Sequence, residues 1–465
     1  MAKNLGGSIF KLGGIAFLIA FLFLPLTLLL ADFQFYPIPT SLIFGNALQA
    51  LLSASFALIL ALPLAYVLIR RTPFSKILHI LSIVPLVLPQ PVMILSLIIL
   101  FGVNGILPLP FSLYGLEGIV LAHALYNFPL AARIIAVKWG ALESYEHVAR
   151  VLGAGKFESF VYVTLPALRG AIFSGFLVAF TYSFTSFSIP LVFGGVANST
   201  IEVEIFRTFF RDFNFSKGIF LAILQVAIFI PIALAWRTVP WHLSGMGKKG
   251  NKIANVLSAA YLLIFAAVLF GPFLKAKFAP VALEPITNSL VLALASAALC
   301  VFLWLLLGEM LSRKLLVFFA ISPAVLAVAY YHLPYSWFLL PIAHAMLSLP
   351  LVAAILLPFS ASIKNYLPAA AILGAGPFQR LIHVRFPLAI RAATLAFLFS
   401  FAFSMGETAL LSSLSQNYPT MSMSLLDAFS HYKFAEGYFY SLLLICISIV
   451  FAVILELSQR EEKVN

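Results

Sequence analysis

The chain has 465 residues, of which 63% are hydrophobic and 9% are charged, and its formal net charge is +12. Soluble domains carry about 25% charged residues, so this composition excludes a water-soluble globular protein. The basic excess is more typical of the cytoplasmic loops of a membrane protein than of a nucleic-acid-binding surface, so we expect no nucleic-acid partner. Apolar runs of about 20 residues, the length that crosses a bilayer, recur along the chain and predict an all-α polytopic membrane protein.

Hydropathy predicts twelve transmembrane helices, six in each half of the sequence. Their centres fall near residues 21, 58, 88, 128, 181 and 228, and then near 263, 298, 324, 347, 401 and 446. Because six is an even number, two halves of this kind insert with the same orientation and are pseudo-symmetric about the membrane normal. We expect a first half at 1–242, a cytoplasmic linker at 243–252 and a second half at 253–465.

Lysine and arginine are divided unequally between the two sides of the expected membrane. With the N-terminus inside, 22 of the 28 fall on one side. The other side receives Arg207, Arg211, Lys217, Lys275, Lys277 and Lys433. Since basic loops stay in the cytoplasm, this distribution predicts a multi-pass protein of the plasma or inner membrane with both termini cytoplasmic.

A polar stretch between the fourth and fifth spans recurs 221 positions later, between the tenth and eleventh. The first copy contains Gly153-Ala-Gly155 and closes with Leu165-Pro166, and the second contains Gly374-Ala-Gly376 and closes with Phe386-Pro387. The glycines supply a permissive hinge, and a proline suits the first turn of the following helix. We therefore predict a helix–turn–helix beneath the membrane near residues 141–166 and again near 362–387.

At these two stretches the chain resembles the permease subunits of binding-protein-dependent ABC importers. Their cytoplasmic loop reads Glu-Ala-Ala, three residues, Gly, and then a closing hydrophobic-x-Leu-Pro. The resemblance implies a type I importer permease fold in which each loop is a coupling helix that docks in a groove of an ATPase subunit. The residues assigned to this role are Glu146, Ala149, Gly153, Ala154, Gly155 and Pro166 in the first copy, and Ala369, Ala370, Gly374, Ala375, Gly376 and Pro387 in the second.

The acidic position departs from the family pattern. Glu146 lies one residue early in the first copy, and the second copy has Leu367-Pro368 with no acid. The two docking surfaces are therefore expected to be unequal.

The length of the chain and the loop after the fifth span indicate which group of permeases the chain resembles. Fused double-length permeases like this one belong mainly to the thiamine and ferric-iron groups. The stretch Thr200-Ile-Glu-Val-Glu204, echoed by Thr420-Met-Ser-Met-Ser424, looks like the thiamine permease, although some iron permeases share it. The resemblance thus implies a pathway for a small solute delivered by an external binding protein, with thiamine ahead of Fe(III).

No stretch of the sequence matches Gly-x4-Gly-Lys-Ser/Thr. That loop cradles nucleotide phosphates, so we expect no enzymatic activity and no cofactor on this chain. The resemblance implies that two copies of an ABC ATPase subunit hold ATP and Mg. The alternative class is an ion-coupled secondary transporter, which needs ionisable relays near the midplane, and these are scarce here.

Ionisable side chains inside spans are costly and are therefore functional candidates. Glu407 lies about 17 residues beyond the cytoplasmic start of its span, or about 25 Å towards the outer side. Its first-half equivalent is Ser186, near Tyr182. A cationic substrate such as thiamine could meet the carboxylate and stack on aromatic faces. A carboxylate hydrogen-bonded within the helix bundle fits these residues equally well.

His123 and His344 occupy equivalent positions in the fourth and tenth spans. We favour symmetric packing residues over paired metal ligands. The two cysteines, Cys300 and Cys446, lie inside apolar runs. Two isolated cysteines support no metal cluster, so no metal site is expected.

Overall fold

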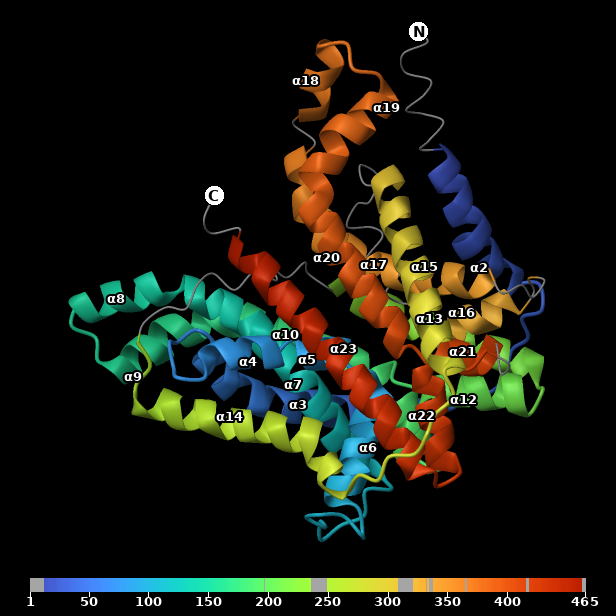
Figure 1. Cartoon of the computed structure of the whole chain (residues 1–465), viewed down its shortest axis with the longest axis horizontal. Coiled ribbons are helices and arrows are strands. Elements are labelled where there is room, and N and C mark those ends of the chain that lie inside the picture. Colours follow the sequence, from blue (N-terminus) through green and yellow to red (C-terminus); the bar gives the residue numbers. More distant parts are fainter. Residues whose placement is uncertain are drawn as a thin grey trace. The chain divides into compact units, whose positions relative to one another are not determined.

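The structure is a computed structural model that describes residues 12–195, 197–235, 249–307, 321–331, 333, 338–363, 366–414 and 418–461 (Figure 1). The described residues form helices and turns, with one isolated bridge between Arg71 and Lys249. Most of the predicted linker at 243–252 lies outside the described residues.

The chain divides into two compact units, each drawn from three stretches of sequence. The first-half unit comprises residues 39–203, 236–281 and 425–465, and the second-half unit comprises 1–38, 204–235 and 282–424. Each unit is therefore built mainly from one sequence half and completed by helices from the other. The division of the sequence at 242 and 253 stays a prediction about the repeat, and it does not coincide with these compact units.

The first-half unit is organised around three long helices that pack against one another, α3, α7 and α10. Its elements are α3 (Thr40–Leu68), α4 (Ser75–Leu81), α5 (Val84–Val87), α6 (Gln90–Phe101), α7 (Leu116–Ala141), α8 (Glu143–Val151), α9 (Lys156–Ser159), the π-helix η2 (Phe160–Thr164), α10 (Leu165–Phe184), α11 (Ser188–Phe193), α14 (Lys252–Phe270), η4 (Gly271–Lys275) and α23 (Phe434–Glu461). From the second sequence half, α14 packs on α3, and α23 packs on α4 and α5.

The second-half unit repeats this arrangement with α15, α17 and α20. Its elements are η1 (Ile19–Phe23), α2 (Leu24–Leu28), the π-helix η3 (Arg207–Arg211), α13 (Phe215–Ala235), α15 (Glu284–Leu307), α16 (Pro323–Tyr330), α17 (Leu339–Ile363), α18 (Tyr366–Ile372), α19 (Pro377–Gln379), the π-helix η6 (Arg380–Arg385), α20 (Phe386–Gly406) and α21 (Ala409–Leu414). The helices α12 (Ile201–Phe206) and α22 (Met421–Ser430) cross the boundary between the units.

Side chains tie the exchanged helices to the unit that receives them. In the second-half unit, the Tyr330 hydroxyl donates a hydrogen bond to the Phe21 carbonyl, and the Phe215 ring stacks on the Tyr331 ring. In the first-half unit, the Tyr261 hydroxyl of α14 donates to the Leu60 carbonyl. A lipid-embedded helix gains no hydrophobic driving force from contact with another helix, so such polar contacts and close packing hold it in place.

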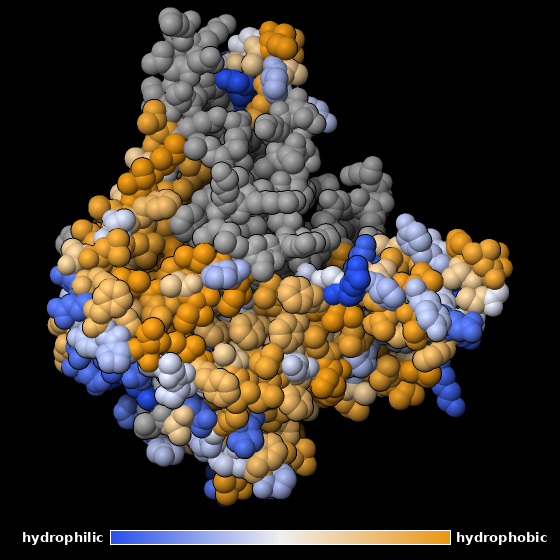
Figure 2. Space-filling view, turned by 180° about the vertical axis from the view of Figure 1, so that it is seen from behind, coloured by the Kyte–Doolittle hydropathy of each residue, from blue (hydrophilic) through white to orange (hydrophobic). Residues whose placement is uncertain are grey.

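Within the described residues, seven helices are long and apolar enough to cross a membrane, or eight if one bent pair forms a single span. Shorter apolar helices occupy 12–28, 339–350 and 392–406. Apolar side chains cover much of the face drawn in Figure 2. The chain is thus a polytopic helical membrane protein, and the total of twelve spans stays a prediction.

The third predicted span is not a straight helix. Its expected centre, residue 88, falls at a break where 75–87 and 90–101 meet at 109°. At this break Leu88 has an extended backbone conformation, with ψ 127°. The cause is the following proline, Pro89, because a proline disfavours a helical conformation in the residue before it.

Candidate functional site

The helix–turn–helix predicted at the two polar stretches is present in both units. The first loop is α8, a turn at Gly153 and α9, and the second is α18, a turn at Gly374 and α19. Figure 1 shows each loop as a helical hairpin at the end of the long helices of its unit.

The same pair of backbone hydrogen bonds closes the turn in each loop. In the first, the Gly153 N–H donates to the Arg150 carbonyl at 3.1 Å and the Ala154 N–H donates to the Ala149 carbonyl at 3.1 Å. Together these bonds satisfy carbonyls that are otherwise orphaned where a helix ends.

In the second loop, the Gly374 N–H donates to the Ala371 carbonyl at 3.1 Å and the Ala375 N–H to the Ala370 carbonyl at 3.0 Å. The adjacent Ala369 carbonyl accepts from the Leu373 N–H. The two turns therefore match bond for bond along the repeat.

This turn requires a left-handed residue, and glycine provides it. Gly153 has φ +96° and Gly374 has φ +91°. A Cβ added at either position would meet no atom within 4 Å. The glycines are therefore required by the backbone conformation and not by crowding.

A second capping contact, which was not predicted from the sequence, forms at the start of the next helix in each loop. There a side chain in the first turn accepts a hydrogen bond from the backbone N–H of the residue before the helix. The Gly155 N–H donates to Glu158 Oε2 at 2.8 Å, and the Gly376 N–H donates to Gln379 Oε1 at 2.9 Å. A Glu or Gln three residues after the cap is the recognisable sequence signal for this contact.

Each loop is continuous with a long helix. The π-helix η2 joins α9 to α10, and η6 joins α19 to α20. Pro166 and Pro387 are the second residues of α10 and α20. Pro166 therefore lies inside the continuous helix Lys156–Phe184, directly after its π-helical turn, and not in the first turn of a helix as predicted.

Large apolar side chains are exposed on both loops at equivalent positions. Leu152 and Leu373 are 82% and 88% exposed. The other exposed pairs are Tyr145 with Tyr366, Val151 with Ile372, and Phe157 with Phe378. Apolar residues gathered on a surface in this way mark an interaction site, for a protein or for a membrane.

The loops differ in how the first helix is tied to the next. In the first copy, the Thr164 hydroxyl donates to Glu146 Oε1 at 2.7 Å and the Trp139 indole N–H donates to the same oxygen at 3.3 Å. The second copy has Leu367 and Arg385 where the first has Glu146 and Thr164, so this carboxylate contact is not repeated.

At its far end, each long helix breaks at the position of Ser186 or Glu407. α10 ends at Phe184 and α11 starts at Ser188, whereas α20 ends at Gly406 and α21 starts at Ala409. Glu407 was expected within a continuous span, and it lies instead in the break between two helices.

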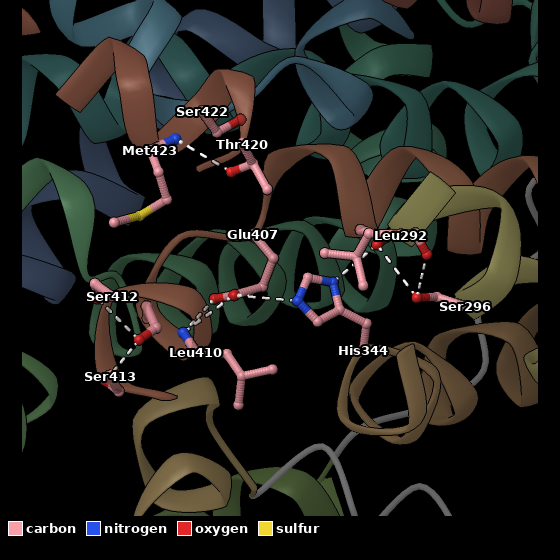
Figure 3. Close-up of polar contacts among 12 residues, drawn as sticks. Leu292, Ser296, His344, Glu407, Leu410, Ser412, Ser413, Thr420, Ser422 and Met423 are labelled. Atoms are coloured by element: carbon pink, nitrogen blue, oxygen red, sulfur yellow. Dashed lines mark hydrogen bonds and ion pairs between the residues drawn. The ribbon is translucent and has the colours of Figure 1, made fainter. Parts of the chain in front are cut away.

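Glu407 is buried and takes part in the start of α21. Both of its carboxylate oxygens lie 3.0 Å from the Leu410 backbone nitrogen, which donates to them (Figure 3). His344 Nε2 lies 3.9 Å from Glu407 Oε2, and His344 Nδ1 shares a 2.8 Å hydrogen bond with the Ser404 hydroxyl. A carboxylate next to the free N–H groups of a helix start is electrostatically favoured.

Ser186 occupies the equivalent break in the first-half unit. Its hydroxyl donates to Gln90 Oε1 at 3.1 Å, and its carbonyl accepts from the Thr200 hydroxyl. Gln90 directly follows the bend at Pro89. The hydrogen bond between Ser186 and Gln90 therefore joins the break after α10 to the bend before α6. Tyr182, one turn earlier, packs on Leu130 and Val178.

The Thr200 and Thr420 stretches are helix starts of the same kind. The Thr200 hydroxyl accepts from the Val203 N–H at 3.3 Å, and the Thr420 hydroxyl accepts from the Met423 N–H at 3.4 Å. The similarity between the two sequences thus reflects a shared helix cap, a threonine hydroxyl at the start of each helix.

The two equivalent histidines are fully buried in polar surroundings. His123 Nδ1 shares a 3.2 Å hydrogen bond with Gln49 Oε1, whose amide donates to the Ser183 carbonyl at 2.9 Å. Among the described residues, no three His, Cys, Asp or Glu side chains group as a metal site. The three candidate pathway residues are divided, since Tyr182 and Ser186 belong to the first-half unit and Glu407 to the second.

Fold and loops together define a helical membrane protein that carries a duplicated, exposed hairpin. The thiamine transport system permease protein ThiP of Escherichia coli (strain K12) is 25% identical over 90% of this chain and 89% of that protein. ThiP of Brucella abortus (strain 2308) is 25% identical over 77% and 76%. No protein-family model matches the chain.

The probable transport system permease protein NifC of Clostridium pasteurianum is 30% identical over 40% of this chain and 68% of its own length. The chain therefore belongs to the permease subunits of ABC importers, in the group that contains the thiamine transport permeases.

The positive φ at the loop glycines yields a direct test. Replacing both Gly153 and Gly374 by valine should abolish transport, because a β-branched residue is strained in a left-handed conformation by roughly 1–2 kcal/mol per site. Replacing both by asparagine, which tolerates this conformation, should preserve most transport. Uptake in vesicles, with circular dichroism as the folding control, measures the difference. Normal uptake by the valine variant would contradict the requirement for this turn.

Proposed function

We propose that the chain is the membrane-spanning subunit of an ATP-driven importer that carries thiamine into the cell. The relatives named as thiamine transport permeases, aligned over most of the chain, support this substrate. The permease provides the pathway, and an extracytoplasmic solute-binding protein delivers the substrate.

The observation that carries the coupling part of the proposal is the bond-for-bond match of the two loops. Two like hairpins with exposed leucines at their tips, Leu152 and Leu373, suit two copies of one ATPase subunit. ATP and Mg are held by those partners. The positive-inside distribution supports cytoplasmic loops and termini in a plasma or inner membrane.

The path of the chain supports a mechanical role for the loops. The first loop is continuous with α10 and the second with α20, and both are long helices. At the rise of an α-helix, each of them spans about 30 Å. The far ends of these helices carry Ser186 and Glu407. When ATP draws the ATPase subunits together, a displaced loop shifts its helix, and the break at the far end moves with it.

For this movement to open and close the pathway, the permease needs two stable arrangements. ATP-bound partners favour one arrangement by contacting its loops more strongly than those of the other. The free energy of ATP binding to the partner subunits therefore acts on the permease through the contact at the loops.

The decisive experiment is uptake of radiolabelled thiamine by proteoliposomes. They contain the permease, its ATPase and the solute-binding protein, each taken from genes beside the permease. We expect uptake that requires both ATP and the binding protein. Uptake of Fe(III) with no uptake of thiamine would replace the substrate. Thiamine uptake without ATP that follows an imposed ion gradient would point to a secondary transporter.

Glu407 is the residue whose charge we expect a cationic substrate to sense. Replacing Glu407 by Gln keeps the shape and an acceptor for the Leu410 N–H but removes the negative charge. Charged hydrogen bonds contribute about 1.5–3 kcal/mol, so the KM for thiamine should rise roughly tenfold or more. Ser186→Ala, at the equivalent break, serves as the matched control. An unchanged KM in the Glu407→Gln variant would contradict a contact between Glu407 and the substrate. Glu407 would then have only its structural role at the start of α21.

A further inference from the structure

An apolar groove lies on the first-half unit between α3 and α10, and it begins at Pro166, next to the first loop. Its volume is about 460 Å³. Sites that hold small ligands have volumes of roughly 300–1,000 Å³, so the groove is large enough for one. Its lining includes Leu58, Leu165, Arg169, Ile172, Phe173 and Phe176. Arg169 is the charged residue in this lining.

The groove lies on a surface that faces lipid. In the helical span 156–184, only 28% of an 18-residue apolar stretch is buried. Phe173 is 58% exposed, and Leu165 is 41% exposed. No described part of the chain therefore fills the groove.

The length of the groove matches one leaflet of the bilayer. The lining extends along α10 from Leu165 to Phe176, within the continuous helix Lys156–Phe184. This stretch is about 16 Å long at the rise of an α-helix. Half of the hydrocarbon core is about 15 Å thick. The groove is therefore about as long as one leaflet is thick.

The groove has a similar length when it is measured along the neighbouring helix, α3. Asn46 bonds to the Phe184 carbonyl and Gln49 to the Ser183 carbonyl, so α3 and α10 run antiparallel. The same register places Leu58 level with Phe173. The distance along α3 from Leu58 to the end of that helix is also about 15 Å.

Arg169 lies one turn into α10, near the shallow end of the groove, and it is exposed. It makes no hydrogen bond or ion pair with any residue that the structure describes. A long basic side chain at this depth extends its charge towards the headgroups. A cation at the shallow end of an apolar groove complements a phosphate joined to an acyl chain.

The second sequence half does not repeat this arrangement. At the positions of Arg169, Ile172 and Phe173 it has Ile390, Ala393 and Thr394. Arg391 is one position further along, which is about 100° around the helix from the equivalent of Arg169. The groove is therefore not a requirement of the duplicated fold.

We propose that this groove binds an anionic phospholipid of the leaflet next to the loops, with its phosphate at Arg169 and an acyl chain along Leu58, Phe173 and Phe176. With the loops cytoplasmic, as in the proposed function, this is the cytoplasmic leaflet, whose anionic lipids attract basic residues. The lipid contacts the helix that carries the first loop.

Native mass spectrometry of the full-length chain, titrated with phosphatidylglycerol or phosphatidylcholine, tests the proposal. We expect wild-type protein to prefer phosphatidylglycerol. Arg169→Gln should bind it about fivefold more weakly, the effect of one basic residue near an anionic surface, and Arg169→Lys should retain most binding. Phe173→Thr, which installs the residue of the second half, should weaken binding of both lipids.

Lys138→Gln is the matched control, because it removes a basic charge from the same end of the unit without touching the groove. Circular dichroism verifies folding. If Arg169→Gln misfolds, lipid binding by Arg169→Lys and Phe173→Thr still tests the proposal. Equal binding of the two lipids by wild type, or an unchanged preference in Arg169→Gln, would overturn the proposal. Because no substrate or ATPase is present, neither result bears on thiamine transport.

Discussion

The loops depend on one backbone constraint: a short helix must stop and the chain must reverse within a few residues. The ends of α8 and α18 leave carbonyl groups without helical partners. The left-handed turns at Gly153 and Gly374 bring N–H groups back to satisfy these carbonyls. The same turns present Leu152 and Leu373 to solvent. Backbone geometry and surface chemistry are thus fixed by a single residue in each half.

Around this shared turn the two halves have diverged in their side chains. Glu146 ties the first loop to Thr164, whereas the second copy has Leu367 at that position. At the helix breaks, Ser186 bonds to Gln90 and its counterpart Glu407 faces Leu410. The duplication therefore retains the backbone framework and the exposed apolar residues of the loops, while the residues at the helix breaks and in the lipid-facing groove differ between halves.

The loops were predictable from the sequence because their geometry is local. A glycine and a proline recur at the same spacing in both halves. The glycine determines the turn, whatever the rest of the fold does, whereas the proline falls within the following helix and does not start it. The exchange of α14 and α23 into the first-half unit was not predictable, since it depends on packing between segments far apart in sequence.

Hydropathy likewise identified the apolar segment around residue 88 but not its bend at Leu88, because apolar residues continue on both sides of the break. Glu407 was recognised by its charge, but its contact with Leu410 required the structure.

Site-specific cross-linking tests the central claim that both loops dock on the ATPase. Cysteine is placed singly at Leu152, Leu373 or Val103, with Cys300 and Cys446 replaced by alanine. Val103 is 87% exposed and precedes α7, at the opposite end of that helix from the first loop. The account predicts cross-links to the ATPase subunit from both loop positions and none from Val103. Failure of both loop positions to cross-link, with the assembled transporter active, would contradict it.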